Sequence, residues 1–399
     1  MKKYFYYVGF NANNSILNTD FFEGSITIYP TGEAGNIYYS NKLLNDTSSQ
    51  EFFDNYKKYI LNTFKKISLE KGNCTFMSFN DKIISLCSEL PEVNFLRNNA
   101  SELLKTINNK SKVKALLDNV VPTIKHRIIT LDNLDYDKIA TTIGSDSFVV
   151  QGMTGAGGNS TYFVSSSKDL ERISDKKQRY SISCYMKHIP LNTTLIVGKK
   201  NTIQFPLSAQ LISKNSGNFK YVGGDFVYPS MALSTNTFSE IYNYNSSIVN
   251  KLSKLGYRGI LGVDYILTEN NDVYFMEINP RLQSSTFLIN QYLHNEYNLD
   301  VATLHYKALK NEILPCIHMK EEDIGKSFLN CNIHNSFDKY KNYALVNEGY
   351  FPPNSSSFYR KVFDSSIIDS GDFERCDILE ERRNDGVEYT KRKRNTAFE

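Results

Sequence analysis

Two carboxylates stand inside neighbouring apolar runs in the second half of the chain. Asp264 interrupts the run at residues 262–267, and Glu277 interrupts the run at residues 273–278. A polar turn rich in Asn and Asp separates the two runs, so the pattern predicts a β-hairpin over residues 259–283. Both acids can then point to one face of the hairpin. An unpaired charge within an apolar run is costly, so the two acids are expected to have a binding function.

Two further residues extend this polar set along the second strand. Asn279 lies two residues beyond Glu277 and shares its face by the strand period of two. Two carboxylates and one amide oxygen form the kind of ligand set that Mg²⁺ prefers, usually together with substrate phosphates. Arg281 can hold a phosphate or a carboxylate through two parallel hydrogen bonds. The alternative is a strand pair with incidental acids at its solvent edge, which the Asn-Pro-Arg sequence disfavours.

Composition and charge indicate a globular protein without a strong bias toward nucleic acid or membranes. The 399 residues are enough for two or three packed units, and 41% of them are hydrophobic. A net charge of +3 is too small to indicate a nucleic-acid partner by itself. The six cysteines are scattered without metal-site spacing, which favours a reducing, cytoplasmic setting. The sequence predicts neither an N-terminal signal peptide nor a membrane span.

Alternating strand and helix patterns in residues 1–105 predict a small parallel α/β domain. The segment at residues 32–35, Gly-Glu-Ala-Gly, lacks the third glycine and the long helix of a dinucleotide-binding loop and is interpreted as a turn. Strands are expected at residues 4–10, 25–29 and 74–79, a helix at 46–68, and a helix or a strand at 81–88.

A glycine-rich segment lies in the next unit, residues 106–185. A basic helix at residues 110–117 opens this unit, and a strand and a short helix follow at 126–131 and 137–143. Residues 148–164 then read as strand, turn and strand, with four glycines within seven residues. Such a turn can present backbone N–H groups to an anion, and a flexible hairpin is the alternative. It is not a P-loop, because no Gly-Lys-Ser/Thr sequence follows.

Residues 186–310 contain the hairpin with its two acids, and residues 311–399 carry fewer signals. A basic run at 391–394 is interpreted as a solvated tail, with salt-dependent nucleic-acid binding as the alternative. Strands are expected at 180–186, 191–197, 205–212 and 358–368, a polar loop at 213–224, and helices at 237–256 and 286–309.

Three features follow one another in the order found in ATP-grasp enzymes, and residues 106–300 resemble that superfamily. They are a lysine-bearing helix, a glycine-rich hairpin, and a hairpin with Asp on one strand and Glu-x-Asn-Pro-Arg on the next. The resemblance implies an α/β and α+β fold. A small Rossmann-like domain, residues 1–105, would precede two ATP-grasp lobes, residues 106–185 and 186–310. A C-terminal extension, residues 311–399, would pack on the ATP-grasp module.

The resemblance also implies roles for individual residues. Asp264, Glu277 and Asn279 would hold Mg²⁺, with Mn²⁺ as an alternative, and Arg281 would contact a phosphate or an acyl-phosphate. ATP would be bound by Gly155, Gly157, Gly158, Asn159 and Ser160 over the phosphates, by Ser183, Tyr185 and Met186 at the interlobe hinge, and by Lys112, or Lys110 in the alternative register, near the α-phosphate.

Other residues near these motifs are candidates for the acceptor end of a site. Arg258 could pair with a substrate carboxylate, and a surface arginine is the alternative. Asp225 could receive an amine, with a turn residue as the alternative, and Gln210 could line the site. His188 and His294 have no partner in the sequence, which favours a structural role for both.

The sequence therefore predicts an ATP- and Mg²⁺-dependent ligase that joins a carboxylate to an amine through an acyl-phosphate and acts on amino acids or small peptides. A carboxylating or thiol-ligating ATP-grasp enzyme is one alternative. Gln151 stands where a second ATP-binding lysine often lies, and Ser183 where the hinge often has glutamate. These departures motivate another alternative, a nucleotide-binding regulatory or scaffold protein with little turnover. The expected partners are small molecules rather than nucleic acid or membranes, and a homodimer is one expected assembly.

Overall fold

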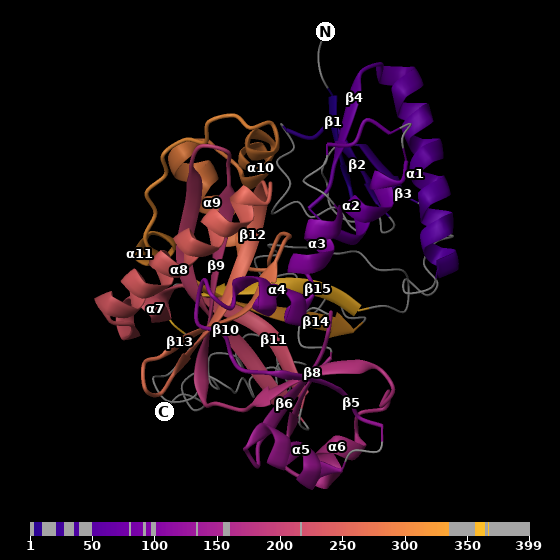
Figure 1. Ribbon diagram of the computed structural model, residues 1–399. Helices are drawn as coiled ribbons and strands as arrows, with labels where there is room; N and C mark the ends of the chain where they lie inside the picture. Colours follow the sequence, from indigo (N-terminus) through magenta and orange to yellow (C-terminus); the bar gives the residue numbers. More distant parts are fainter. Residues whose placement is uncertain are drawn as a thin grey trace.

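A computed structural model describes residues 4–9, 21–27, 36–39, 50–79, 81–90, 93–96, 101–132, 135–154, 160–215, 218–334, 356–363 and 366. These residues form an N-terminal α/β domain, two lobes that share one large sheet, and a C-terminal strand pair at that sheet (Figure 1). The predicted fold class is confirmed. The predicted turn at residues 32–35 and the basic run at 391–394 lie outside the described residues.

The N-terminal domain is built on four parallel strands in the order β3-β2-β1-β4. Helix α1 lies along one side of this sheet (Figure 1), and Phe52, Tyr56 and Ile60 recur on its buried face. The elements are β1 (Tyr4–Val8), β2 (Gly24–Thr27), β3 (Asn36–Tyr39), α1 (Gln50–Lys71), β4 (Cys74–Met77), α2 (Asp81–Ser88) and α3 (Ser101–Ile107).

Helix α4 (Lys110–Leu117), at the predicted position, leads from this domain toward the two lobes. Asn109 caps its first turn, because the Asn109 side chain accepts hydrogen bonds from two backbone N–H groups, those of Ser111 and Lys112. One face of α4 is buried, including Val113 and Leu117. The phase of this helix decides which of its lysines faces inward.

The small lobe lies at the lower end of the molecule in Figure 1 and has its own apolar core. Phe148, Val150, Val164 and Ile182 of its strands are buried in this core. The elements are β5 (Arg127–Thr130), α5 (Tyr136–Ile143), β6 (Phe148–Gly152), β7 (Thr161–Val164), α6 (Ser167–Glu171) and β8 (Arg179–Cys184).

The large lobe holds the predicted hairpin in a sheet that continues into the small lobe, with the strand order β13-β12-β9-β10-β11-β7-β6-β8-β5. Its core merges with that of the N-terminal domain, so residues such as Phe76 and Val263 belong to one apolar cluster. The elements are β9 (His188–Val197), β10 (Thr202–Asn215), β11 (Asn218–Asp225), α7 (Val227–Ala232), α8 (Thr235–Lys254), β12 (Gly259–Thr268), β13 (Val273–Asn279), α9 (Thr286–Tyr297) and α10 (Val301–Leu309).

Two predictions in this lobe were wrong. The expected polar loop at 213–224 is largely strand, because β10 and β11 form an antiparallel hairpin whose ladder satisfies the backbone of this polar segment. The expected helix at 286–309 is broken into α9 and α10. Asn298 adopts a left-handed conformation with φ of 48° and ends α9, and the Asp300 carboxylate accepts from the Thr303 N–H to begin α10.

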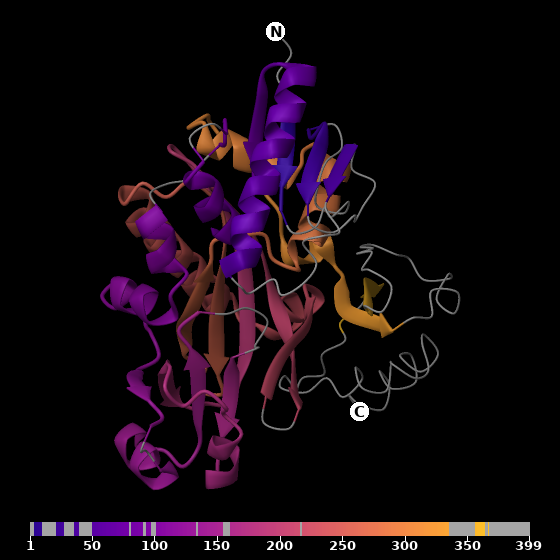
Figure 2. The same cartoon turned by 90° about the vertical axis from the view of Figure 1, so that its right-hand side faces the viewer.

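The described part of the C-terminal region packs on the large lobe. Strand β14 (Ser327–His334) pairs with β11 and with β15 (Ser356–Phe363), which confirms a strand near the predicted position. The Glu321 carboxylate, in helix α11 (Glu321–Ile324), accepts hydrogen bonds from the Leu207 N–H and the Tyr242 hydroxyl, both at 2.9 Å. Figure 2 shows this strand pair beside the main sheet. Among the described helices, none combines the length and apolarity needed to cross a membrane.

Candidate functional site

The two acids that interrupt the apolar runs lie side by side on the hairpin. Asp264 on β12 pairs in register with Glu277 on β13, and Gly262 pairs with Asn279. A register shift directly follows Asp264. Strand β9, on the other side of β12, places Asn192 opposite Asp264. The expected shared face is therefore confirmed, and pairing with β9 adds an amide that the sequence alone did not reveal.

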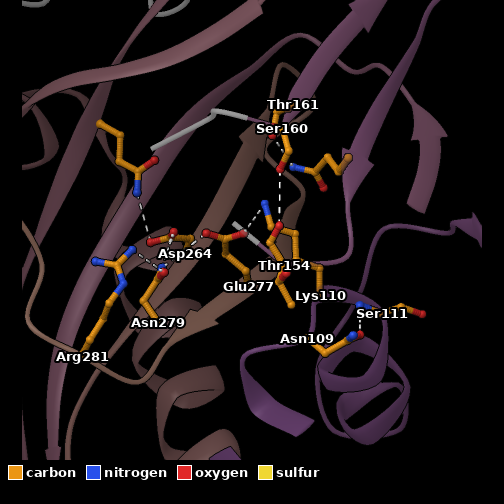
Figure 3. Close-up of polar contacts among 12 residues, drawn as sticks. Asn109, Lys110, Ser111, Thr154, Ser160, Thr161, Asp264, Glu277, Asn279 and Arg281 are labelled. Carbon is orange, nitrogen blue, oxygen red and sulfur yellow. Dashed lines mark hydrogen bonds and ion pairs between the residues drawn. The ribbon is translucent and has the colours of Figure 1, made fainter. Parts of the chain in front are cut away.

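The polar side chains on this face bond to one another (Figure 3). Asn279 Nδ2 donates to Asp264 Oδ2 at 2.9 Å and to Glu277 Oε1 at 3.4 Å. Gln210 Nε2 donates to Asp264 Oδ1 at 3.0 Å, and Asn192 Nδ2 donates to the same oxygen at 2.5 Å. Arg281 Nη2 donates to Asn279 Oδ1 at 3.1 Å. Asp264 is therefore surrounded by amide donors, whereas Asn279 links both acids to the guanidinium.

Helix α4 contributes the lysine that faces this group. Lys110 Nζ lies 2.8 Å from Glu277 Oε2 (Figure 3). The Lys110 backbone N–H donates to the Met153 carbonyl at 3.0 Å. Lys112 is exposed and does not line the cavity, so the structure places the alternative register, Lys110, at the site. The physical reason is helical phase. Two residues differ by about 200° around the helix, so both lysines cannot face the sheet.

The two acids have opposite pKa shifts. Burial, and then the charge of Glu277, raise the pKa of Asp264 to about 7. Burial would also raise the pKa of Glu277, but the charge and hydrogen bond of Lys110 outweigh it and hold that pKa below its usual value. Glu277 is thus stabilised as an anion by a lysine, whereas no lysine or arginine among the described residues forms an ion pair with Asp264, which would gain most from a nearby positive charge.

The donor set fits a hard divalent cation such as Mg²⁺. Within the described residues no three His, Cys, Asp or Glu side chains come together, so the ligands available are the Asp264 and Glu277 carboxylates and the Asn279 amide. Mg²⁺ is typically bound by one or two carboxylates, with waters and substrate phosphates completing the shell. Asn279 turns Nδ2 toward the acids, and it would have to reverse its amide to offer oxygen.

These groups line one side of a cavity of about 460 Å³, a size typical of small-molecule sites. Its other walls are mostly apolar or aromatic. They include Val149 from β6, Tyr185 from the segment between β8 and β9, Pro190 from β9, Ile266 from β12 and Met276 from β13. The cavity therefore has a charged floor, formed by Lys110, Asp264, Glu277 and Arg281, and largely apolar walls contributed by both lobes.

The loop between β6 and β7 is described only at its ends. Gly155, Gly157, Gly158 and Asn159 lie outside the described residues. Ser160 is described: its Oγ donates to the Thr154 carbonyl at 3.4 Å, and its carbonyl accepts from the Gly152 N–H at 2.9 Å. A Cβ at Gly152 would come within 2.8 Å of Ser160 Oγ, so this position favours glycine.

The predicted hinge residues differ in their placement. Tyr185 lines the cavity, whereas Ser183 is buried on β8 and Met186 is not among the cavity residues. Met186 instead offers its carbonyl to His188 Nδ1 at 2.6 Å, so Nδ1 carries the proton. His188 also lines the cavity, and the structural role that the sequence favours for it stays a prediction. Burial lowers its pKa, opposed by the bond to Met186.

Two glutamines that the sequence singled out, Gln151 and Gln210, both line the cavity. Gln151 does line the cavity, is 9% exposed, and contacts Thr161 Oγ1 through Nε2 at 3.5 Å. Gln210 also lines it, as expected, and contacts Asp264. A neutral amide thus occupies the small-lobe wall facing the charged floor.

Two other candidates lie outside the cavity. Arg258 Nη1 donates to the Ser253 carbonyl at 3.2 Å and the Tyr257 carbonyl at 2.6 Å, which ties this side chain to the end of α8. The predicted catalytic role of Arg258 is therefore not supported by its position. Asp225 is buried and accepts from the Val227 and Tyr228 N–H groups at the start of α7, which confirms the turn interpretation.

Comparison with known proteins agrees with this geometry. Residues 107–285 match the family model of the ATP-grasp domain, and this part of the chain is an ATP-grasp domain. No curated protein sequence matches the chain significantly. The fold is similar to solved structures at low sequence identity, and that similarity defines the architecture rather than the reaction.

Three of these structures show how much of the chain is shared. The biotin carboxylase domain of Hydrogenobacter thermophilus 2-oxoglutarate carboxylase, solved with MgADP, ADP and bicarbonate, has a TM-score of 0.61 and 16% identity, covering 90% of this chain and 85% of that one. An N5-carboxyaminoimidazole ribonucleotide synthetase solved with ADP has a TM-score of 0.61 and 13% sequence identity, and the match covers 91% of this chain and 93% of that one. The Aspergillus clavatus N5-carboxyaminoimidazole synthase, solved with ADP and 5-aminoimidazole ribonucleotide, has a TM-score of 0.59 and 14% sequence identity. The match covers 91% of this chain and 95% of that one.

Proposed function

We propose that this protein is an ATP- and Mg²⁺-dependent ligase that joins a carboxylate to an amine through an acyl-phosphate. The observation that carries the proposal is the convergence of Lys110, Asp264, Glu277, Asn279 and Arg281 in one cavity of an ATP-grasp domain. Proteins of similar fold were solved with ADP or MgADP, which supports nucleotide and metal binding at this place.

The two ends of the cavity suit the two ends of a nucleotide. Val149, Ile266 and Met276 offer apolar surface to a base. Lys110 is the cation nearest Glu277 and can turn to a phosphate when a metal neutralises that carboxylate. Asp264, Glu277 and Asn279 would hold the metal. When bound, Mg²⁺ would neutralise the charge that develops on the phosphates during transfer.

The reaction requires two displacements. The substrate carboxylate attacks the γ-phosphorus, the bond from γ-phosphorus to the β-bridging oxygen breaks, and ADP leaves. The amine nitrogen then attacks the acyl carbon, the bond to the phosphate oxygen breaks, and phosphate leaves with the amide formed. The chain contributes Arg281, whose guanidinium can stabilise the anionic oxygens in both steps, and Lys110, which positions the phosphates.

A second candidate is ATP-dependent carboxylation, in which bicarbonate takes the place of the carboxylate. The similarity in fold to a biotin carboxylase domain bound to bicarbonate favours this candidate. The first chemical step is the same, because bicarbonate also attacks the γ-phosphorus. The two candidates differ in the acid and therefore in the product.

The test is release of ADP and phosphate from MgATP with panels of amino acids, peptides and other carboxylates, followed by mass analysis of the products. An amide product that depends on both acid and amine supports the proposal. Incorporation of isotope-labelled bicarbonate would favour the carboxylase. If Mg·ADP binds but no acid or amine gives release, a nucleotide-binding protein with little turnover becomes the better description.

A further inference from the structure

Helix α4 turns two lysines toward the interior of the molecule, one helical turn apart. The Lys110 side chain is 10% exposed and paired with Glu277, as Figure 3 shows. Lys114 is only 2% exposed, and its ammonium makes no hydrogen bond or ion pair with any residue that the structure describes. The neighbouring buried positions of α4, Val113 and Leu117, are apolar. A helix that needed only to pack would carry an apolar residue at 114 as well.

The surroundings of Lys114 are electrostatically connected to the site. Burial, and then the charge of Lys110, lower the pKa of Lys114 to about 8, and Glu277 opposes this shift. Lys114 also contributes to lowering the pKa of His126, after burial. A buried ammonium without a counter-ion is costly for folding. Its place on α4, one helical turn from the lysine that contacts Glu277, points to a binding role.

Among the described residues that line the cavity, the lysine and arginine side chains available to nucleotide phosphates are Lys110 and Arg281. Gln151 is neutral on the small-lobe wall, and Lys110 is engaged by Glu277. A cation bound at Glu277 would replace Lys110 as the counter-charge of that carboxylate. Lys110 would then be released from Glu277. Lys114 repels it, because like charges one turn apart on a helix destabilise each other.

We propose that Lys114 is a positioning residue for the nucleotide phosphates, which directs Lys110 into the cavity and adds the positive charge that the neutral Gln151 does not provide. The proposal rests on nucleotide binding at the proposed active site, but it does not depend on which acid or amine is used. Lys114 acts through its charge and through Lys110, without touching the nucleotide.

The test combines ligand-free stability with Mg·ADP binding in the full-length protein. Lys114→Met removes the charge and keeps a side chain of similar shape. We expect the unfolding temperature of the ligand-free protein to rise by roughly a few degrees, because a buried charge is removed. We expect the Kd for Mg·ADP, measured by titration calorimetry, to increase on the order of tenfold.

Two further variants separate charge from packing. Lys125→Met makes the same chemical change at an exposed position just beyond α4 and is expected to alter neither quantity. Lys114→Arg keeps the charge and is expected to bind Mg·ADP more tightly than Lys114→Met does. Equal affinities of these two variants would show that packing matters rather than charge, and would overturn the proposal.

Each remaining outcome is also decisive. A Lys114→Met protein that is more stable and binds Mg·ADP as well as the original would show that the buried lysine has no binding role. A less stable variant would show a structural role, and this also contradicts the proposal. If the original protein binds Mg·ADP but shows no ligase turnover, the proposed function fails while the Lys114 test is unaffected. Failure of the original protein to bind Mg·ADP would overturn both.

Discussion

The two ends of the cavity hold their residues by different forces. At the hairpin end, charged and amide groups hold one another: Asp264 accepts from Gln210, Glu277 from Lys110, and Asn279 from Arg281. At the hinge end, aromatic packing dominates. Tyr185 lies 4.8 Å from Phe163 of β7 and 6.3 Å from Phe219 of β11 between ring centroids, and so connects the two lobes.

This difference shows where precision is needed. Charge stabilisation depends on donors and acceptors fixed before the reaction, which the interlocked hairpin provides. Recognition of a flat base depends more on shape and apolar area, which aromatic and aliphatic walls provide. The variants below test whether the hairpin end carries the chemistry and how charge elsewhere in the cavity alters affinity.

Glu277→Gln should have the largest effect. The change removes a carboxylate from the metal set and leaves Lys110 without its ion pair. ADP release should fall on the order of a hundredfold or more, while circular dichroism stays that of the original protein. Turnover at the original rate would remove the metal assignment from this residue.

Lys110→Met and Lys112→Met form a pair on one helix. Lys110 lines the cavity, and Lys112 is exposed outside it. The first substitution should raise the Kd for Mg·ADP by tenfold or more, about the value of one charge-assisted hydrogen bond. The second should leave that Kd unchanged, and calorimetry decides between them. A larger effect of Lys112→Met than of Lys110→Met would instead support Lys112 as the lysine near the phosphates, which the sequence favoured.

Affinity for the metal should increase with pH. Burial and the charge of Glu277 raise the pKa of Asp264 to about 7, so at about pH 6 most molecules carry a proton there. The Kd for Mg·ADP should fall roughly tenfold between about pH 6 and 8. Asp264→Asn should abolish this dependence, and a flat profile in the original protein would contradict the assignment.

The same shift has a defined sign for stability. The folded pKa of Asp264 lies above its ordinary value of 3.8, so the folded state binds the proton more tightly. The resulting stabilisation is complete below the ordinary pKa and is lost as the pH rises through about 7. The ligand-free protein should therefore lose stability in the window where it gains affinity for the metal.

Gln151→Lys should have the smallest effect and acts at the small-lobe wall. A lysine there adds a positive charge to the cavity, and the Kd for Mg·ADP should fall by about three- to tenfold. In the Lys114→Met background the same change should recover part of the lost affinity. Weaker binding in both backgrounds would indicate that the neutral amide is itself required.

Local patterns predicted the hairpin end well because its geometry is local. Asp264, Glu277 and Asn279 lie on two consecutive strands, and the strand period of two fixes their common face. The choice between Lys110 and Lys112 was not local, because the phase of α4 depends on its packing against the sheet. Asn192 reaches the site only through the pairing of β9 with β12, 72 positions away in sequence from Asp264.

The same reasoning explains the errors in the fold. The segment at residues 213–224 has a loop composition, yet its backbone gains strand partners on both sides, from β10 and β14. Asn298 and Asp300 contain the signals that end one helix and begin the next, but apolar spacing on either side predicted one continuous helix. Arg258 has a suitable charge and position in sequence, whereas its contacts fix it at the end of α8.

The amide of Asn279 has a consequence for the order of events. Its Oδ1 accepts from Arg281 while its Nδ2 faces the two carboxylates. Reversing the amide to place oxygen beside the acids would set Nδ2 against the guanidinium, and Arg281 would lose Asn279 as an acceptor while keeping the Leu282 carbonyl. Binding of a cation that takes the Asn279 oxygen would therefore release Arg281 from Asn279. Asn279 would then couple the two events, so that the guanidinium becomes available to an anionic substrate only after a metal is in place.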